Sequence, residues 1–271
     1  DFALSSAALY MVEVALARTL IEAGVRPDLT FGASMGSFAA ATISGAITVR
    51  EALEGVISQA ELVECSGARG GMIAVLASPQ DVASALHGIE MEFAAFHFDG
   101  HVVVSAPADA LEAVQSTLSR RKYIHHKLSV NHPFHSRWID PLEVKLGGIV
   151  PAGRRRKANP LLVSCAHDAT LKELPDDFFW TVARRPIDFH GTLRRLEETG
   201  PHAYVNLGPT ETLANFARYL VEQGSGSQVL TCLTPFGDDV TGLNSVLTAL
   251  SGLQGKAACG SVAEAGGTWV T

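Results

Sequence analysis

Apolar positions at the start of the chain repeat with helical spacing. They predict a helix over residues 4–23, which Gly24 ends. The residues expected on its apolar face are Leu4, Ala8, Met11, Ala15 and Leu20. A short apolar strand is predicted at 29–31, and Thr48 is placed to cap a further helix over 49–66.

At residue 70 the pattern changes to short strands separated by turns. Strands are predicted at 72–76, 93–98, 102–105 and 123–130, and helices at 79–86 and 107–121. Asp99-Gly100, between two of these strands, is a strong hairpin signal. The resulting order, βαββαβ, is that of a ferredoxin-like unit. We therefore predict that residues 70–130 form a subdomain inserted into a body made of residues 1–69 and 131–254.

Beyond residue 130, strands again alternate with helices. The strands are predicted at 161–164, 203–207 and 229–233, and the helices at 138–146, 178–182, 192–199, 213–222 and 240–250. This alternation is typical of a mainly parallel sheet, so the body is predicted to be α/β. The Gly- and Ala-rich stretch 255–271 has no clear periodicity and is interpreted as a tail.

Composition excludes several functional classes. The chain has 271 residues, 47% of them hydrophobic, and a formal net charge of −7, which describes an acidic globular protein with a large core. The densest basic run, 154–157, lies between prolines and is interpreted as a solvated loop, so no nucleic-acid partner is expected. We also expect no membrane partner, because no membrane span or signal peptide is visible. The four cysteines lack the spacing of a zinc site or a disulfide framework, so a reducing cytoplasm is the expected location.

The segment DLTFGASMGSFAAATISG, from Asp28 to Gly45, contains a candidate nucleophile. A predicted strand runs into Gly-Ala-Ser-Met-Gly and a helix of small residues follows, which is the pattern of a G-x-S-x-G nucleophile elbow. The glycines permit a sharp turn that would expose Ser34, and the amide of Met35 would then point at an oxyanion formed by attack of that serine. The alternative is a glycine-rich turn that carries an idle serine.

A serine needs a general base to act as a nucleophile at neutral pH. Ten histidines are available. His125 and His126 are neighbours on a predicted strand, so they point to opposite faces and cannot act together. The pair in Asn-His-Pro-Phe-His-Ser, residues 131–136, lies on a loop leaving the subdomain, where a side chain can face a cleft.

Several motifs occur together in one order: GASMG, the inserted ferredoxin-like unit, HPFHS, RRPIDF and NLGPTETL. This set resembles the acyltransferase domains of polyketide and fatty-acid synthases, the malonyl-transacylase family, over residues 3 to about 250. The resemblance implies an α/β, hydrolase-like body, with Ser34 as the nucleophile and His135 as the base. It also implies that the substrate is an acyl thioester of an acyl carrier protein or of CoA, and that neither a metal nor a bound cofactor is needed.

The same resemblance implies that a main-chain carbonyl in the segment Pro186–Phe189 orients the imidazole of His135. Asp188 holds that place, and its backbone oxygen, or alternatively its carboxylate, would accept the proton on Nδ1. Asp188 could equally be a solvated loop acid.

Departures from the family pattern concern the acyl pocket. Ala33 and Ser37 replace the usual His and Glu of the elbow, and Gln59 aligns with the arginine that pairs with the free carboxylate of malonyl groups. A carboxylate buried without a bidentate cation carries a heavy desolvation cost, so malonyl-type substrates are predicted to be poor and neutral acyl groups preferred. His97 stands where the family commonly has asparagine, either as a polar group of the cleft or as a core histidine. Phe134 is counted with the acyl pocket.

Gln59 and the altered elbow are similar to a subgroup of this family, the acyl hydrolases of polyketide pathways whose acyltransferases act in trans. In these, water replaces the second thiol as acceptor. The alternatives are a transacylase that loads a neutral acyl unit and a non-catalytic docking remnant of a synthase. An esterase of the α/β-hydrolase class fits less well, because no late histidine follows an acid and the ferredoxin-like insert is foreign to that fold.

Family members begin with a strand and a Gly-Gln-Gly-rich turn, which supplies a second oxyanion N–H. Only 33 residues precede Ser34 and they contain no such turn. Loss of one oxyanion donor typically costs about 10²- to 10³-fold in rate. We therefore expect this chain to be a fragment, or else a weak catalyst, and we expect the missing strand to leave an edge or a gap in the sheet.

Overall fold

The computed structural model describes residues 2–234, 237, 239–257 and 267–270. Its amino-terminal part contains α1 (Phe2–Glu22), β1 (Pro27–Gly32), α2 (Gly36–Ile43) and α3 (Val49–Cys65). The inserted part contains β2 (Gly70–Val75), α4 (Pro79–Ala85), β3 (Glu92–Phe98), β4 (His101–Pro107), α5 (Ala108–Arg120) and β5 (His125–Lys127). A 3₁₀ turn (Arg137–Leu142) follows, and then α6 (Glu143–Gly147), β6 (Leu161–Ser164), β7 (Ala169–Leu171), α7 (Phe178–Arg184), β8 (Ile187–Asp188), α8 (Phe189–Glu197), β9 (Ala203–Asn206), α9 (Thr212–Leu220), β10 (Gln228–Thr231), α10 (Asp239–Ala257) and β11 (Gly267–Val270).

The body is built on a six-stranded sheet in the order β10-β9-β11-β1-β6-β7. All pairs are parallel except β6 with β7, so the predicted mainly parallel sheet is confirmed. β1 lies inside this sheet, and Thr30 and Phe31, near its carboxyl end, are fully buried. Its carboxyl end therefore presents the following turn from the interior of the body.

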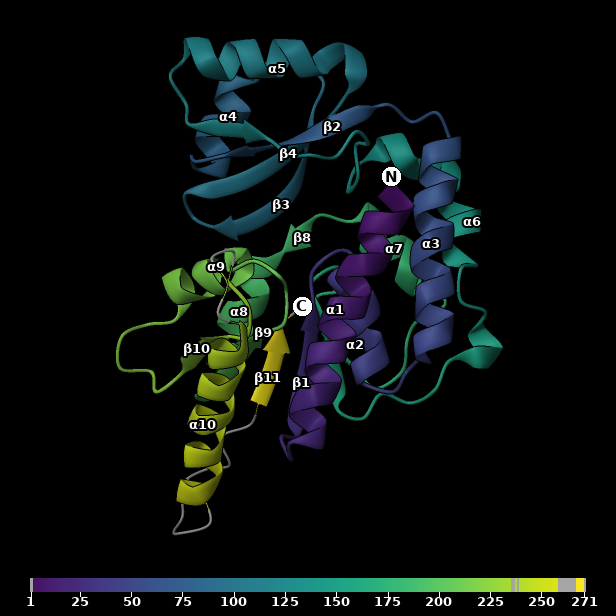
Figure 1. Cartoon of the computed structure of the whole chain (residues 1–271). Coiled ribbons are helices and arrows are strands. Elements are labelled where there is room, and N and C mark those ends of the chain that lie inside the picture. Colours follow the sequence, from purple (N-terminus) through teal and green to yellow (C-terminus); the bar gives the residue numbers. More distant parts are fainter. Residues whose placement is uncertain (1, 235–236, 238, 258–266, 271) are drawn as a thin grey trace.

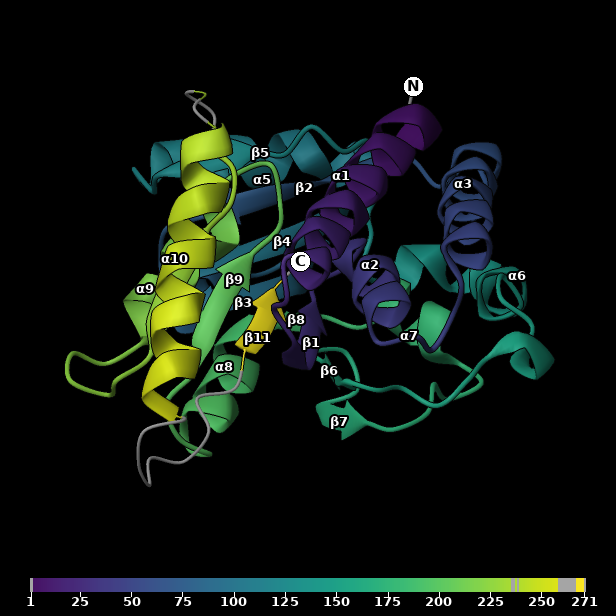
Figure 2. The same ribbon diagram turned by 60° about the horizontal axis from the view of Figure 1, so that its bottom comes forward.

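Strand β11 corrects two expectations. It lies between β1 and β9 in the middle of the sheet (Figure 2), so the interpretation of 255–271 as a tail is wrong for residues 267–270. Among the described residues the sheet is continuous from β10 to β7, without the expected gap, and α10 extends to Ala257. A four-residue strand paired on both edges needs no alternating pattern, which is why periodicity did not reveal it. The rest of the predicted tail, 258–266 and 271, falls outside the described residues.

The inserted unit has the predicted ferredoxin-like order. Its strands are arranged β5-β2-β4-β3 and are antiparallel, with α4 and α5 on the face turned away from the body (Figure 1). The hairpin at Asp99-Gly100 joins β3 to β4 as expected. β8, which comes from the body segment, adds a fifth strand parallel to β3. The two units therefore share this sheet, so the predicted boundary at residue 130 does not fully separate the inserted unit from the body.

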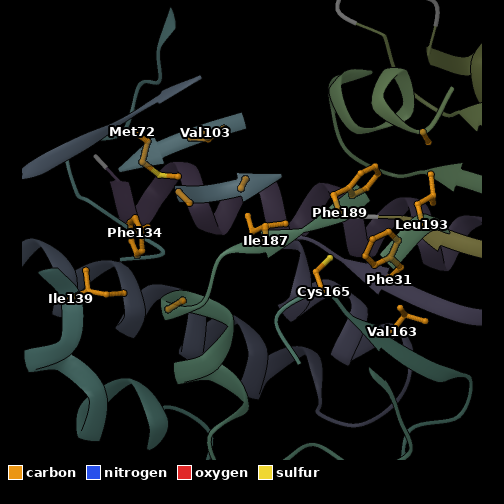
Figure 3. Close-up of a cluster of buried hydrophobic side chains, with 14 of the residues drawn as sticks. Phe31, Met72, Val103, Phe134, Ile139, Val163, Cys165, Ile187, Phe189 and Leu193 are labelled. Carbon is orange, nitrogen blue, oxygen red and sulfur yellow. The ribbon is translucent and has the colours of Figure 1, made fainter. Parts of the chain in front are cut away.

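One hydrophobic cluster connects the body to the inserted unit. Phe31 and Phe189 contribute from the body, Met72 and Val103 from the inserted sheet, and Ile187 of β8 lies between them (Figure 3). Burial of such side chains contributes about 1.5–3 kcal/mol each. This shared core fixes the position of the inserted sheet relative to the carboxyl end of β1.

The buried face of α1 differs from the predicted one. Leu4 and Met11 are 70% and 58% exposed, whereas Tyr10 is fully buried and its hydroxyl lies 3.0 Å from Thr42 Oγ1. Contacts of Tyr10 with α2 therefore set the rotation of the helix. Within the described part of the chain, α1 alone is long and apolar enough to cross a membrane, but it packs against α2 and α3, which accounts for that composition.

In the basic run at 154–157, Arg154, Arg156 and Lys157 are exposed, as predicted for a solvated loop, whereas Arg155 packs into the protein. The Arg155 side chain is buried and donates hydrogen bonds to the carbonyls of Val150 and Pro175 at 2.8 Å. Arg156 pairs at 3.0 Å with Glu51, whose carboxylate also accepts from the Thr48 amide in the capping box of α3. These contacts attach the loop to the start of α3.

Glu13 on α1 is expected to make stability depend on pH. Its side chain is 3% exposed, Oε2 has no hydrogen-bond partner among the described residues, and burial raises its pKa to about 8. Up to about pH 8, the Glu13 carboxyl of the folded protein thus keeps its proton. In the unfolded chain the same carboxyl loses its proton above the ordinary pKa of glutamate. Between pH 5 and 8 the free energy of unfolding should fall by about 1.4 kcal/mol per pH unit from this group. Urea denaturation at pH 5, 6.5 and 8 measures the slope, and E13Q should flatten it; an equal slope in E13Q would contradict the assignment.

Candidate active site

The turn between β1 and α2 has the geometry of a nucleophile elbow. Ser34 has a φ of 53°, in the left-handed region that non-glycine residues rarely adopt. A Cβ on Gly32 would lie 2.4 Å from the backbone oxygen of Gly36, so this position accepts only glycine. The hydroxyl of Ser37, which is buried, donates to the Gly32 carbonyl at 3.1 Å. Ser37 therefore stabilises the turn at the position where the family usually has Glu.

Gly32→Ala should destabilise the protein by about 2 kcal/mol, because the added methyl group overlaps backbone atoms that cannot move without opening the elbow. Thermal or urea unfolding measures the loss. Gly24→Ala serves as a contrast, since a Cβ there meets no atom within 4 Å. The only cost of that substitution is the backbone strain of an alanine at a φ of 98°. Unchanged stability of Gly32→Ala would mean that the elbow is not held as described.

The structure brings together the two residues predicted to react. Ser34 Oγ lies 2.9 Å from His135 Nε2. His135 is 2% exposed, also has a left-handed φ, of 58°, and donates its amide proton to the Ala183 carbonyl at 2.9 Å. Both members of the pair thus occupy strained backbone positions that surrounding contacts maintain, as is common at functional sites.

A backbone carbonyl orients the imidazole, but it does not belong to Asp188. His135 Nδ1 lies 2.9 Å from the carbonyl oxygen of Arg185. A carbonyl only accepts, so Nδ1 carries the proton and Nε2 presents its lone pair to the hydroxyl of Ser34. The prediction for Asp188 is therefore wrong: its carboxylate accepts from the Gly191 amide at 2.8 Å and caps α8. Its own carbonyl accepts from the hydroxyl of Thr192.

Burial keeps this histidine in its basic form. It lowers the pKa of His135 to about 4, while the hydrogen bond to Arg185 acts in the opposite direction. The imidazole is consequently neutral above about pH 5, whereas an ordinary histidine is half protonated at pH 6.5.

If His135 is the general base, kcat/KM for acylation should keep most of its plateau value at pH 5.5, because its imidazole takes up a proton only near pH 4. An imidazole with an ordinary pKa of about 6.5 would retain only about a tenth of it there. Rates with a small uncharged thioester between pH 4.5 and 8 provide the measurement. A half-maximum near pH 6.5 would contradict the burial of the base.

A cavity of about 400 Å³ opens at Ser34. The predicted site residues that line it are Ser34, Met35, Gln59, His97, Phe134 and His135. Most of the other walls are apolar, and they include Met72, Ala95, Val103, Leu128 and Ile187. Ala33 does not line it and packs against the shared core instead. A polar hollow of about 520 Å³ adjoins the cavity, and Ser129 and Val130 line both.

Gln59 lies in the wall of this cavity, on the buried face of α3. It is 5% exposed, and its Oε1 has no hydrogen-bond partner among the described residues. Among the described residues that line the cavity, none is Lys or Arg. A carboxylate entering here would therefore lose its hydration without gaining a cationic partner.

His97 is both buried and part of the cavity wall. Its ring stacks on Phe216 at a centroid distance of 4.4 Å, and its Nδ1 lies 3.0 Å from Nδ1 of His101. Burial is the main cause that lowers the pKa of His97 to about 3, and the neighbouring His101 contributes in the same direction. Burial also lowers the pKa of His101. When both rings are neutral, one of them can donate its Nδ1 proton to the unprotonated Nδ1 of the other. Neither His101 nor Phe216 was predicted to belong to the site, because their contacts arise from the packing of α9 against β3.

The amide of Met35 lies one residue beyond Ser34, at the start of α2. No acceptor for it occurs among the described residues, and α2 begins at the next residue. An unpaired amide at a helix start favours negative charge nearby.

An α/β body with a serine elbow, a histidine from a following loop and a ferredoxin-like insert defines an acyltransferase-type protein. The chain belongs to the acyl transferase domain family, which matches residues 3–258. It is 31% identical over 245 residues to "Polyketide biosynthesis acyltransferase homolog BaeD" of Bacillus velezensis and 30% identical over 244 residues to PksD, of the same description, of Bacillus subtilis; each alignment covers 89% of this chain and 75% of the relative.

A solved structure, the acyl transferase domain of SpnD in complex with 2-(pent-4-yn-1-yl)malonyl, is 27% identical with a TM-score of 0.82. The match covers 90% of this chain and 60% of that one, so the chain spans less than two thirds of that structure's length. The fold similarity extends across both the body and the inserted unit.

Proposed function

We propose that this protein cleaves acyl thioesters through an acyl-serine intermediate on Ser34, with His135 as general base. The distance of 2.9 Å between Ser34 Oγ and His135 Nε2, inside a cavity of about 400 Å³, carries the proposal. The names of the Bacillus relatives support a place in polyketide biosynthesis. The substrates would be thioesters of an acyl carrier protein or CoA, handled in the cytoplasm without a metal or a bound cofactor.

In the first half-reaction, Ser34 Oγ attacks the thioester carbonyl carbon and His135 Nε2 takes its proton. The Met35 amide stabilises the oxyanion that forms. The C–S bond then breaks, and the thiol leaves with the proton held by His135. Arg185 keeps Nδ1 protonated throughout, and its carbonyl faces the positive charge that develops on the ring.

In the second half-reaction an acceptor attacks the acyl-serine and His135 takes the acceptor's proton. Water as acceptor yields a free acid, and the proton returns to Ser34. We propose hydrolysis of neutral acyl groups, because Gln59 supplies no charge for a malonyl carboxylate and the cavity walls are mainly apolar. Transfer to a second carrier thiol is the other candidate, and membership of the acyl transferase family favours it.

Acetyl-, hexanoyl- and malonyl-carrier thioesters, offered with and without a second carrier protein, distinguish these reactions. Release of free acid without an acceptor, absent in Ser34→Ala, supports hydrolysis. Movement of the acyl chain to the second carrier marks a transferase. A serine-reactive fluorophosphonate should modify Ser34 in either case. Absence of both labelling and turnover would contradict catalysis. The remaining alternative would then be a non-catalytic docking remnant of a synthase.

A further inference from the structure

The charges of the inserted unit are strongly segregated. Between residues 70 and 130, all four Lys and Arg residues fall within 120–127, whereas the six Asp and Glu residues lie elsewhere, at positions 81 to 112. The four basic side chains, those of Arg120, Arg121, Lys122 and Lys127, are exposed. None of them forms an ion pair within the described part of the chain. A chain of net charge −7 thus presents one local cationic surface here.

Two large apolar side chains are exposed next to these cations. Ile124 is 71% exposed and Leu76 is 49% exposed. They are neighbours, since the Leu76 amide donates to the Ile124 carbonyl at 2.9 Å at the outer end of the β2–β5 pair. An apolar centre beside basic residues is the composition of a protein-binding site. Asp81, the nearest acid along the chain to Leu76, accepts a hydrogen bond from Ser78 at the start of α4.

This surface leads directly into the active-site cavity. Side chains alternate along a strand, so Ile124, His126 and Leu128 share one face of the sheet. His126 lies opposite Ala74, which packs against the core shared with the body, so this face is the one that α4 and α5 leave open (Figure 1). Leu128 and the following residues up to Val130 line the cavity together with Ser34. The path from Ile124 to Leu128 is about 13 Å, at roughly 3.3 Å per residue.

We propose that the surface formed by Leu76, Arg121, Lys122, Ile124 and His126 docks the protein domain that carries the acyl thioester. The proposal rests on the function proposed above. The partner would present acidic side chains to the cations and an apolar side chain to Ile124. Its thioester arm would then run along the open face of β5, past Leu128, to Ser34. An extended phosphopantetheine arm is longer than the stretch of about 13 Å from Ile124 to Leu128.

Arg121→Glu and Ile124→Asp, made separately, test the surface. Each should lower kcat/KM for an acyl-carrier thioester by about tenfold, because complementary charge and buried apolar contact accelerate and stabilise docking. Each should leave kcat/KM for the corresponding N-acetylcysteamine thioester unchanged, since that small neutral substrate needs no docking. Higher salt should reduce turnover of the carrier substrate more in the unmodified protein than in Arg121→Glu.

Lys145→Glu is the matched control, because Lys145 is an exposed cation on α6, outside this surface. Equal losses on both substrates, or no loss on the carrier substrate, would overturn the docking surface while leaving the proposed function in place. If the unmodified protein turns over neither thioester, the proposed function fails, and the docking surface fails with it. If Arg121→Glu and Ile124→Asp lose self-association but keep turnover of the carrier substrate, the surface binds a second copy of the chain and not the carrier.

Discussion

Ser34→Ala should lower the rate of thioester cleavage by about 10⁴-fold or more. The Ser34 hydroxyl lies 2.9 Å from Nε2 of His135, and the lone pair of this nitrogen faces the hydroxyl. Without it no acyl-enzyme can form. Intact-protein mass spectrometry after mixing with an acyl thioester should show one acyl adduct on the unmodified protein and none on Ser34→Ala. Ser245→Ala is the control, since that hydroxyl is exposed on α10 and bonds the Thr241 carbonyl.

His135→Gln should lower the rate by a similar factor, and the double variant should be no slower than either single variant, because the two side chains act as one unit. The elbow should stay intact in His135→Gln, since its hydrogen bonds are local to residues 32–38. An acyl adduct that forms at the normal rate in His135→Gln would show that another group activates the serine.

The sequence predicted the elbow and the inserted unit well because both depend on local chemistry. Glycines at a strand–helix junction have one strong structural interpretation, and so has Asp-Gly between two short strands. Ser34 and His135 followed from these elements together with a family resemblance. The same reasoning placed Gln59, His97 and Phe134 in one cavity.

Other features of the site depend on backbone positions that residue types do not reveal. Any residue can offer a carbonyl, so the sequence could not distinguish Arg185 from Asp188 as the group that orients His135. The pairing of His97 with His101 depends on α9, which is distant in the chain and places Phe216 over the ring. Strand β11 is too short to show a period, and its place in the sheet is set by the free edges of β1 and β9.

The strain in the site explains why these distant contacts matter. Ser34 and His135 both have positive φ values, and a left-handed conformation is unfavourable for residues with a Cβ. The elbow is maintained by Ser37 and by the lack of a side chain at Gly32, and the loop of His135 by the carbonyls of Ala183 and Arg185. The geometry of the pair therefore depends on two separate sets of contacts, one local to the elbow and one between the loop of His135 and the end of α7.

Gln59→Arg should raise kcat/KM for a malonyl thioester by up to about 100-fold relative to the unmodified protein. Residue 59 is buried in the cavity wall on α3, and its Oε1 lacks a partner among the described residues. A guanidinium there could bind the malonyl carboxylate bidentately, and hydrogen bonds to charged groups contribute about 1.5–3 kcal/mol each. Turnover of the acetyl thioester should not rise, because it gains no such contact.

Gln59→Met separates charge from size, since it fills the same volume without a polar group and should leave malonyl turnover low. Thermal unfolding of both variants checks that the change on α3 is tolerated, because a buried guanidinium without its ligand lowers stability. The competing explanation is that the walls exclude malonyl by shape; then Gln59→Arg would fold and still reject it. If malonyl is already the best substrate of the unmodified protein, the argument from the missing cation fails, and an unidentified group must compensate the carboxylate.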